Sequence, residues 1–210
     1  MTLSNSPSNP DMPSDDEILR LRITEIFYSL QGEARTVGWP TVFVRLTGCP
    51  LRCGYCDTAY AFQGGRWLSL EEIEKQVASY SPLYVTVTGG EPLAQKQCLE
   101  LLSHLCDEGY NVSLETGGAL DISPVDPRVV KVIDIKTPDS GEVNKNRYEN
   151  IAQLSASDQV KFVICSRQDY LWAKKIVEQY DLTQQVEVLF SPVHGQLAPR
   201  DLADWILSDR

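Results

Sequence analysis

The sequence predicts an α/β fold in which a partial, open (β/α)6-type barrel of parallel strands is covered by helices. Apolar runs rich in Val and Ile alternate with helical patterns along most of the 210 residues, and this alternation is typical of parallel sheets. Six such units are too few for a closed eight-stranded barrel, which usually takes about 250 residues. No internal repeat or interior linker is visible, so residues 21–210 are expected to form a single domain.

The first strand is expected at residues 22–30, where it leads into the polar turn at 31–33. Further strands are predicted where β-branched and apolar residues form short runs. These runs lie at residues 41–46, 83–88, 111–116, 129–136, 160–165 and 186–190. Because the chemistry of parallel α/β sheets lies at the carboxyl ends of the strands, functional residues are expected directly after these runs.

Helices are expected between the strands, at residues 69–80, 93–108, 145–154, 166–180 and 199–207. Ser69 and Glu72 form a capping box, in which each side chain accepts a hydrogen bond from a free backbone N–H of the first turn. Ser166 caps the fourth helix, and Asp169 lies in its first turn, where the helix dipole favours a negative charge. The connection between residues 116 and 129 contains two prolines and is expected to hold only a short helical turn.

Composition and charge narrow the range of functions. The formal net charge is −10 and the pI about 4.7, so a groove that follows nucleic-acid phosphates, which needs an excess of Lys and Arg, is not expected. No apolar run is long enough to cross a membrane. Residues 1–20 are expected to be a disordered leader, without the apolar segment of a signal peptide. The protein is therefore expected in the cytoplasm, with its six cysteines reduced.

Three cysteines, Cys49, Cys53 and Cys56, follow directly after the predicted strand at 41–46. The glycines and proline around them favour an irregular loop that can wrap the thiolates around one centre. A structural zinc site normally has four ligands, and a closed iron–sulfur site of the ferredoxin type has a fourth thiolate, yet no further Cys or His lies nearby. A chance cluster of buried cysteines does not explain the position at a strand end. Three thiolates on a four-iron cluster would leave one iron open to a ligand.

The spacing C-x3-C-x2-C, with the aromatic Tyr55 before the third cysteine, resembles the signature of the radical S-adenosylmethionine (SAM) superfamily. The resemblance implies a [4Fe–4S] cluster whose open iron is chelated by the amino and carboxylate groups of SAM. The next strand ends in Gly89-Gly90-Glu91-Pro92, which resembles the superfamily's motif for the SAM amino group. Paired glycines let a ligand approach the backbone closely. A non-enzymatic iron–sulfur electron carrier should not need this turn.

Polar residues also follow the later strands, at Glu115-Thr116, at Asp134 and Lys136, and at Ser191 and His194. Asp134 and Lys136 share a face of their strand, but a contact between them is not expected within one straight strand. Charged groups at a buried strand end need partners. Together these residues favour a site at the carboxyl edge of the sheet.

Motifs over nearly all of the chain after the leader resemble the 7-carboxy-7-deazaguanine synthase family of radical SAM enzymes. These motifs lie at residues 27–33, 43–45, 56–58, 89–92, 115–116, 134–138 and 191–192. The resemblance implies a lyase that contracts 6-carboxy-5,6,7,8-tetrahydropterin to 7-carboxy-7-deazaguanine with loss of ammonia, for 7-deazapurine synthesis including queuosine. A 5′-deoxyadenosyl radical from reductive SAM cleavage would abstract a substrate hydrogen, and SAM would be re-formed. No catalytic side chain beyond the cluster and SAM is implied.

The resemblance also implies a role for each matching residue. Substrate would contact Leu30, Gln31, Gly32, Glu33, Arg45 and Thr88. SAM would contact Tyr55, Asp57, Gly90, Glu91, Lys136 and Ser191. Thr58 resembles the family's magnesium ligand, and one hydroxyl plus substrate oxygens suits Mg2+. Arg45 lies on an apolar strand where its planar guanidinium needs an anion, which a substrate carboxylate would supply.

The family further suggests a homodimer and an electron donor such as flavodoxin. Its members usually continue with a further strand and a histidine that helps to hold substrate, whereas this sequence ends at Asp209-Arg210. Two other functions stay open on the sequence alone. One is another small radical SAM enzyme, such as a glycyl-radical activase, and the other is the electron carrier. The turn at 31–33, Arg45 and Thr58 favour the synthase, because they suit a small carboxylated pterin.

Overall fold

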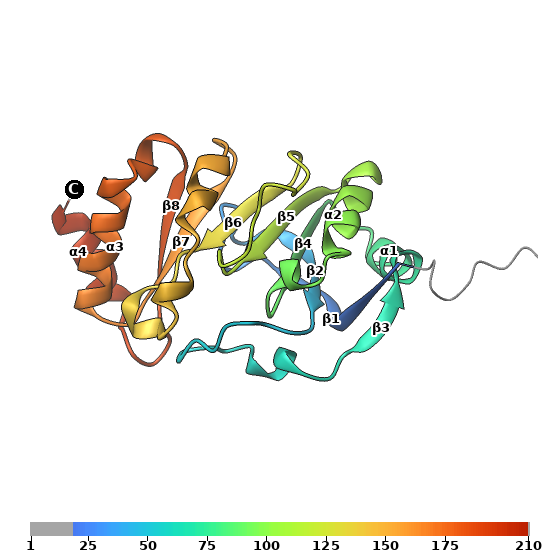
Figure 1. Cartoon of the computed structure of the whole chain (residues 1–210), viewed down its shortest axis with the longest axis horizontal. Helices are drawn as coiled ribbons and strands as arrows, with labels where there is room; N and C mark the ends of the chain where they lie inside the picture. The colour runs from blue at the N-terminus through green and yellow to red at the C-terminus, as the bar shows by residue number, and fades with distance from the viewer. Residues whose placement is uncertain (1–18, 210) are drawn as a thin grey trace, which may run out of the picture.

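The computed structural model describes residues 19–209, which form one mixed sheet with helices packed on its outer side (Figure 1). The strand order in this sheet is β3-β1-β2-β4-β5-β6-β7-β8. Strands β2 and β4 to β8 run parallel to their neighbours, while β1 is antiparallel to both β2 and β3. The sheet is open, which confirms the predicted α/β class with a partial barrel. The prediction did not include β3 or the antiparallel direction of β1.

Seven of the strands lie close to their predicted positions, and β3 was missed. The strands are β1 Arg20–Leu30, β2 Pro40–Leu46, β3 Arg66–Ser69, β4 Tyr84–Gly89, β5 Asn111–Thr116, β6 Val130–Asp134, β7 Gln159–Ile164 and β8 Glu187–Pro192. The short β3 gives little signal because most of it is exposed, and it exists through pairing with the start of β1. The predicted leader at 1–20 falls almost wholly outside the described residues, although β1 already includes Arg20.

Four α-helices are present in the described part of the chain: α1 Leu70–Ala78, α2 Cys98–Asp107, α3 Arg167–Gln179 and α4 Pro199–Asp209. The capping box of α1 is confirmed, since Ser69 Oγ accepts from the Glu72 backbone N–H at 3.2 Å and Glu72 Oε2 accepts from the Ser69 N–H at 2.8 Å. The hydrogen bond that the Ser69 backbone N–H donates to the Glu72 carboxylate is the main cause that holds the pKa of Glu72 below its usual value. Ser166 caps α3 as predicted, accepting from the Asp169 N–H.

The predicted helix at 145–154 is wrong, because this segment forms only 3-10 turns, at Val143–Lys145 and Tyr148–Gln153. Asparagine side chains hold it to neighbouring backbone instead. Asn146 pairs its amide with both the N–H and the C=O of Lys136, at 2.8 Å each. Asn150 donates to the carbonyls of Gly118 and Leu120. Side-chain bonds of this kind compete with the regular helix ladder. The predicted helix at 93–108 is also shorter, since a 3-10 turn at Pro92–Ala94 precedes α2.

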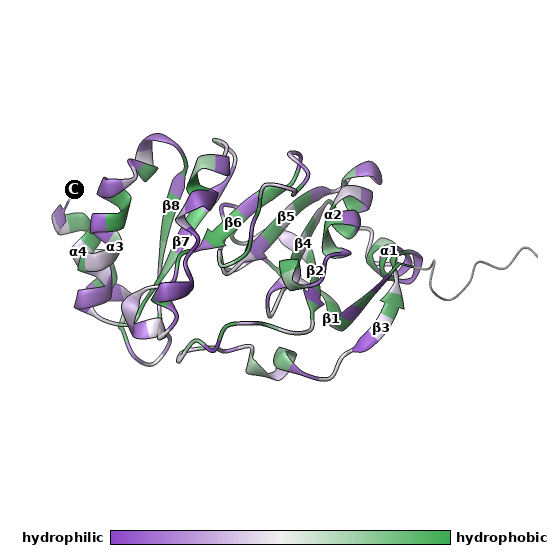
Figure 2. Cartoon of the chain, viewed as in Figure 1, coloured by the Kyte–Doolittle hydropathy of each residue, from purple (hydrophilic) through white to green (hydrophobic). Residues whose placement is uncertain are grey.

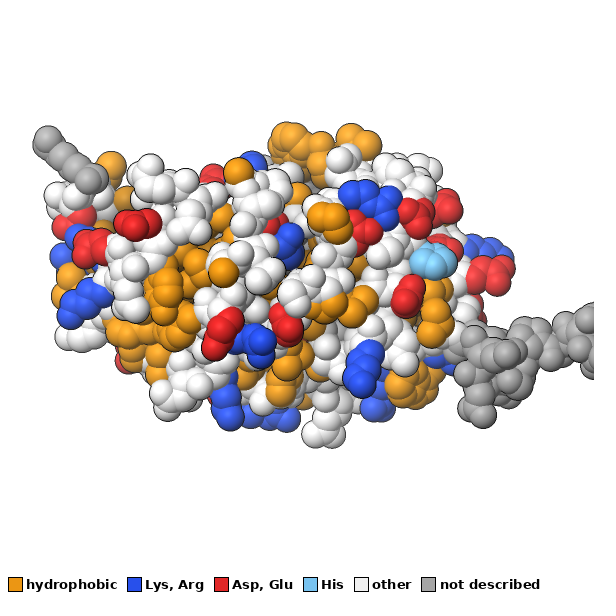
Figure 3. Space-filling model, turned by 45° about the horizontal axis from the view of Figure 1, so that its top comes forward, with side chains coloured by type: hydrophobic (Ala, Val, Ile, Leu, Met, Phe, Trp, Pro, Cys, Tyr) orange, Lys and Arg blue, Asp and Glu red, His pale blue; other side chains and the backbone are white. Residues whose placement is uncertain are grey.

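The two faces of the parallel strands differ in polarity (Figure 2). Apolar residues on the outer face, such as Val87, Leu114 and Phe162, are fully buried and belong to the main core beneath the helices. The alternate residues face inward and are largely polar, Thr88 and Lys161 among them. A closed eight-stranded barrel fills its interior with apolar side chains. The open barrel instead keeps a polar concave face, which is suited to holding a polar ligand. On the molecular surface in Figure 3, acidic and basic side chains are interspersed.

Two loops close the ends of the barrel. The floor loop, residues 31–39, follows β1 at the amino ends of the parallel strands and crosses to the far side of the sheet. There the Arg35 N–H donates to Gln159 Oε1 at 2.9 Å, and its guanidinium pairs with Glu187 at 2.7 Å. The cysteine loop, residues 47–58, follows β2 at the carboxyl ends. The space between these two loops is where the site is expected.

One buried carboxylate fixes the segment that supports the cysteine loop. Asp169, fully buried at the start of α3, accepts hydrogen bonds from the Asp139 N–H, the Thr137 hydroxyl and the Cys165 N–H, at 3.0, 3.0 and 3.1 Å. The same segment accepts the Gly54 N–H through the Ser140 carbonyl at 3.0 Å. The cysteine loop therefore depends on Asp169 indirectly.

Replacing Asp169 by Ala should lower the free energy of unfolding by about 2–4 kcal/mol, because three donors would lose their acceptor in a buried place. Urea denaturation followed by circular dichroism measures this change. Lys175→Ala, at an exposed position of the same helix, is the control and should change stability by less than about 0.5 kcal/mol. Equal stability of the two variants would show that Asp169 does not anchor the segment.

Candidate active site

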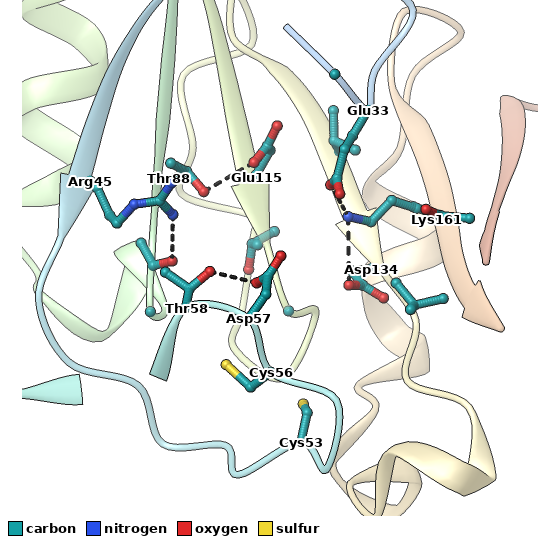
Figure 4. A pocket seen from close by; sticks show the side chains of 18 of the residues that line it. Glu33, Arg45, Cys53, Cys56, Asp57, Thr58, Thr88, Glu115, Asp134 and Lys161 are labelled. Atoms are coloured by element: carbon teal, nitrogen blue, oxygen red, sulfur yellow. Dashed lines mark hydrogen bonds and ion pairs between the residues drawn. The ribbon is translucent and has the colours of Figure 1, made fainter. Parts of the chain in front are cut away.

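A cavity of about 690 Å³ lies between the floor loop and the cysteine loop. This volume is in the range of pockets that hold small molecules. Every residue for which the sequence predicted a site role lines the cavity, and so does His194. The cavity also receives Glu115, Asp134 and Lys161 from the concave face of the sheet (Figure 4).

The three cysteines of the loop lie half-buried at the cavity, with free thiols. Burial raises the pKa of the Cys49 and Cys53 thiols, while the nearby Lys136 ammonium acts in the opposite direction. No three Cys, His, Asp or Glu side chains within residues 19–209 are grouped so as to hold one metal ion. Within residues 19–209 the cavity is lined by three cysteines and no fourth, a donor set that fits a four-iron cluster with one open iron better than a closed four-ligand zinc site.

The cysteine loop lies directly against the end of β4. The Glu91 N–H donates to the Gly48 carbonyl at 2.8 Å, and the Gly90 N–H donates to the Leu46 carbonyl at 3.3 Å. A Cβ atom on Gly90 would collide with the Gly48 carbonyl and come within 3.0 Å of the Cys49 Cβ. Gly90 is thus required for the contact between the two loops, whatever it binds.

Glu91 joins the ends of β4 and β5. Its carboxylate is fully buried and accepts from the Thr116 hydroxyl at 2.9 Å, from the Gly117 N–H at 2.8 Å and from the Leu93 N–H at 3.1 Å. Burial raises the pKa of Glu91 in spite of these hydrogen bonds. The hydrogen bonds of Glu91 to Thr116, Gly117 and Leu93 stabilise the cavity wall. Its contact with SAM stays a prediction.

Arg45, for which the sequence predicted an anionic partner, pairs with a residue that the sequence did not single out. Its Nε donates to Glu25 Oε1 at 2.8 Å, and one terminal nitrogen donates to the Gly89 carbonyl at 3.3 Å. The Tyr60 hydroxyl also donates to Glu25 Oε1, at 2.7 Å. Glu25 and Arg45 are directly opposite one another in the β1–β2 pairing. The guanidinium is therefore held in place before any ligand arrives, with part of its fork left toward the cavity.

The opposite wall carries alternating charges. Lys136 donates to Asp134 Oδ2 at 2.8 Å, and Lys161 donates to Glu33 Oε2 at 2.6 Å while its ammonium lies 3.8 Å from Asp134 Oδ2. The expectation that Asp134 and Lys136 do not touch was wrong, because β6 ends at Asp134 and the chain bends there. Burial alone would lower the pKa of Lys136, but the Asp134 carboxylate outweighs it and the pKa is raised. Both lysines are thus kept as cations.

Between these walls, Glu115 forms the centre of a hydrogen-bonded set. It accepts from the Gln31 amide at 3.1 Å and from the Thr88 hydroxyl at 3.0 Å. The side-chain oxygen of Gln31, Oε1, accepts from the backbone N–H groups of Gly32 and Glu33, at 2.8 and 3.2 Å. Gln31 is almost fully buried, so it shapes the turn from which Glu33 reaches Lys161. Leu30 lines the cavity beside this turn.

Several polar atoms of the cavity are left for a ligand. Among residues 19–209, the Tyr55 hydroxyl and Asp134 Oδ1 are buried without a hydrogen-bond partner, which is costly unless a bound group satisfies them. Thr58 donates to Asp57 Oδ1 at 2.7 Å, and these two residues form the end of the cysteine loop (Figure 4). Ser191 lines the cavity from β8. The set of three thiols and these unsatisfied polar atoms fits a cluster together with a polar cofactor.

Sequence reasoning missed two charged residues of the site, Glu25 and Lys161, and it placed Glu115 and Asp134 at the site without a specific role. A signal was available for Glu115 and Lys161. In Thr86-x-Thr88, Ser113-x-Glu115 and Gln159-x-Lys161 the polar residues recur with a period of two, which is unusual for strands expected to be apolar on both faces. This period indicates a polar concave face.

Comparison with known proteins gives a consistent result. Residues 43–134 match the model of the radical SAM superfamily. The 7-carboxy-7-deazaguanine synthase of Chlorobaculum tepidum is 47% identical over 193 residues, covering 90% of this chain and 88% of the relative. The enzyme of the same name from Koribacter versatilis is 42% identical, covering 90% and 91%.

Solved structures share the fold. The crystal structure of QueE from Escherichia coli superimposes with a TM-score of 0.75 at 19% identity, covering 90% of this chain and 91% of that one. A structure of TYW1 with a lysine–pyruvate adduct gives a TM-score of 0.58 at 15% identity, over 80% and 70%. At these identities the structures confirm the architecture, whereas the sequence relatives confirm the resemblance based on the motifs. The chain belongs to the 7-carboxy-7-deazaguanine synthase family.

Proposed function

We propose that the protein converts 6-carboxy-5,6,7,8-tetrahydropterin to 7-carboxy-7-deazaguanine with loss of ammonia, and so supplies 7-deazapurine synthesis, including that of queuosine. The observation that carries the proposal is the set of residues that line the cavity between the floor loop and the cysteine loop. A cysteine loop with three thiols adjoins two separate binding ends, a guanidinium at one and a carboxylate–ammonium pair at the other. A carboxylated pterin has a matching anionic end and a matching hydrogen-bonding edge.

Cys49, Cys53 and Cys56 would hold a [4Fe–4S] cluster, which together with SAM supplies the 5′-deoxyadenosyl radical chemistry of the superfamily. Tyr55 and Lys136 would contact SAM, and two observations support this: both line the cavity, and the Tyr55 hydroxyl is buried without a hydrogen-bond partner among residues 19–209. The other proposed SAM contacts are Asp57, Gly90, Glu91 and Ser191. These residues lie around the cysteine loop and the ends of β4 and β8.

The substrate carboxylate would bind at Arg45, whose fork is already oriented by Glu25. A magnesium ion held by Thr58 and substrate oxygens would lie at the same end, because Arg45 and Thr58 both line the cavity and the Arg45 guanidinium lies 6.0 Å from the ring of Tyr60, two residues after Thr58 (Figure 4). The pterin edge would bind at Glu33, with Leu30, Gln31, Gly32 and Thr88 completing the pocket. Separate ends for the two parts of the substrate fix its orientation beneath the cofactor.

The remaining proposals concern the setting of the reaction. Pro50, Arg52 and Gly54 of the cysteine loop are exposed, which supports electron delivery to the cluster by a docked carrier such as flavodoxin. Exposed apolar side chains on and near β1, including Tyr28, Leu30 and Trp39, support a homodimer. The free cysteines support a cytoplasmic location. No helix within residues 19–209 has the length and apolar character needed to cross a membrane.

Reconstitution tests the function directly. With the cluster rebuilt anaerobically, and with dithionite, SAM, Mg2+ and the carboxytetrahydropterin added, we expect 7-carboxy-7-deazaguanine by mass spectrometry. Cys56→Ser should abolish both the cluster absorbance and product, whereas Cys106→Ser, outside the cavity, should retain both. SAM cleavage without product would overturn the substrate assignment alone. Failure of the wild-type protein to take up a cluster would overturn the radical chemistry as well.

Thr58→Ala should remove most of the stimulation of product formation by Mg2+, because the ion would lose its protein ligand. A titration of initial rate against Mg2+ concentration measures this effect. Thr183→Ala, at an exposed threonine outside the cavity, is the matched control. Full magnesium dependence in Thr58→Ala would contradict the ligand role.

Arg45→Lys should raise the KM for the pterin roughly ten- to a hundredfold, because an ammonium cannot bond Glu25 and also grip a carboxylate with two parallel N–H donors. Steady-state kinetics at saturating SAM measure the change. Arg35→Lys alters another arginine that pairs with a carboxylate, Glu187, but outside the cavity, and should leave KM unchanged. An unchanged KM in Arg45→Lys would place the substrate carboxylate elsewhere.

A further inference from the structure

Lys161 is a buried cation of the cavity to which the proposed function so far gives no task. It lies on β7 and points from the concave face toward Glu33 (Figure 4). Its side chain is 11% exposed, and its ammonium donates to Glu33 Oε2 at 2.6 Å. The distance of 3.8 Å to Asp134 Oδ2 is too long for a hydrogen bond. Asp134 already has a closer partner in Lys136, at 2.8 Å.

Both members of the Lys161–Glu33 pair have unused hydrogen-bonding capacity. An ammonium has three N–H donors, and among the described residues Lys161 uses one of them, for Glu33. Within the same residues, Glu33 accepts only through Oε2, which leaves Oε1 free. Both side chains line the cavity. The pair therefore presents a charged donor and a charged acceptor side by side to whatever the cavity holds.

The pterin edge carries the complementary groups in the same order. Its C4 carbonyl oxygen is an acceptor, and the neighbouring N3–H and 2-amino groups are donors. We propose that Lys161 is a substrate-recognition residue that donates to the C4 carbonyl oxygen while Glu33 accepts from the N–H groups beside it. This inference rests on the proposed function and adds the residue that selects the 4-oxo form of the ring.

Selection between ligands follows from whether each contact pairs a donor with an acceptor. A 4-amino analogue would bring an N–H group against the Lys161 ammonium, so that two donors would face each other. Sites built to hydrogen-bond a substrate group reject analogues that cannot make the bond, because buried polar groups of the protein are left unpaired. Burial alone would lower the pKa of Lys161, but the carboxylates of Asp134 and Glu33 outweigh it and raise the pKa, so the side chain is a cation. The hydrogen bond to Glu33 holds the ammonium in position for this discrimination.

Two unreactive ligands test the proposal: 6-carboxypterin and its 2,4-diamino analogue, in which an amino group replaces the 4-oxo group. The Kd of each is measured by calorimetry on the cluster-loaded protein with SAM present. The wild-type protein should prefer the 4-oxo ligand. Lys161→Met should weaken that ligand roughly ten- to a hundredfold and leave the 4-amino ligand nearly unchanged, so that the preference falls by the same factor. The part of the preference that remains comes from Glu33, because N3 of the analogue carries no hydrogen for its carboxylate to accept.

Lys131→Met is the matched control, because Lys131 is also a buried lysine paired with a carboxylate, Asp158 at 3.1 Å, but does not line the cavity. It should leave the preference intact. Lys161→Gln provides a second variant in case Lys161→Met does not fold; its amide oxygen can accept from a 4-amino group, so the preference should move toward the analogue.

Equal weakening of both ligands, or of neither, in the Lys161 variants would overturn the recognition role. If the wild-type protein cleaves SAM but binds neither pterin, the proposed function fails and the inference fails with it. If the wild-type protein binds the 4-oxo ligand and the Lys161 variants keep its preference, only the inference fails. The two failures are therefore distinguishable.

Discussion

The contact between the cysteine loop and the end of β4 is the constraint on which the site depends. It is made by backbone atoms, with the Glu91 N–H bonded to the Gly48 carbonyl, and it leaves no room for a Cβ atom at Gly90. The Glu91 side chain then extends the connection to β5 through Thr116 and Gly117. The loop that carries the thiols is thereby fixed in position relative to two strands of the sheet, β4 and β5.

A polar concave face requires that its charges be compensated within the fold. Each buried cation of the cavity has a carboxylate partner: Glu25 for Arg45, Asp134 for Lys136 and Glu33 for Lys161. Breaking one such pair leaves a buried charge without a partner, which is more costly than the pair itself is stabilising. The pairs also leave donors and acceptors unused, at the Arg45 fork and at Glu33. Compensation and recognition are thus carried by the same side chains.

The sequence was sufficient to predict which strand ends carry the residues of the site. It was not sufficient to predict which of these residues pair with one another. The apolar runs located seven strands, and the motif residues all reached one cavity. Glu25 could not be assigned, because its place opposite Arg45 depends on the antiparallel pairing of β1 and on a bulge between Ile23 and Glu25. Lys161 could not be matched with Glu33 without knowing that the floor loop crosses the barrel. The helix expected at 145–154 failed because its asparagines bond to distant backbone.

The contacts of the floor loop also have a consequence for the order in which parts of the molecule fold. Its contacts join residues far apart in the chain: Gln31 with Glu115 is separated by 84 residues, Glu33 with Lys161 by 128 and Arg35 with Glu187 by 152. The Gly48–Glu91 contact, by comparison, closes a much shorter stretch. Contacts of long sequence separation carry the larger loop-closure entropy and slow folding. In a nascent chain the cysteine loop would therefore be held in place before the cavity is complete. The cavity would be completed only when the last two strands, β7 and β8, have joined the sheet.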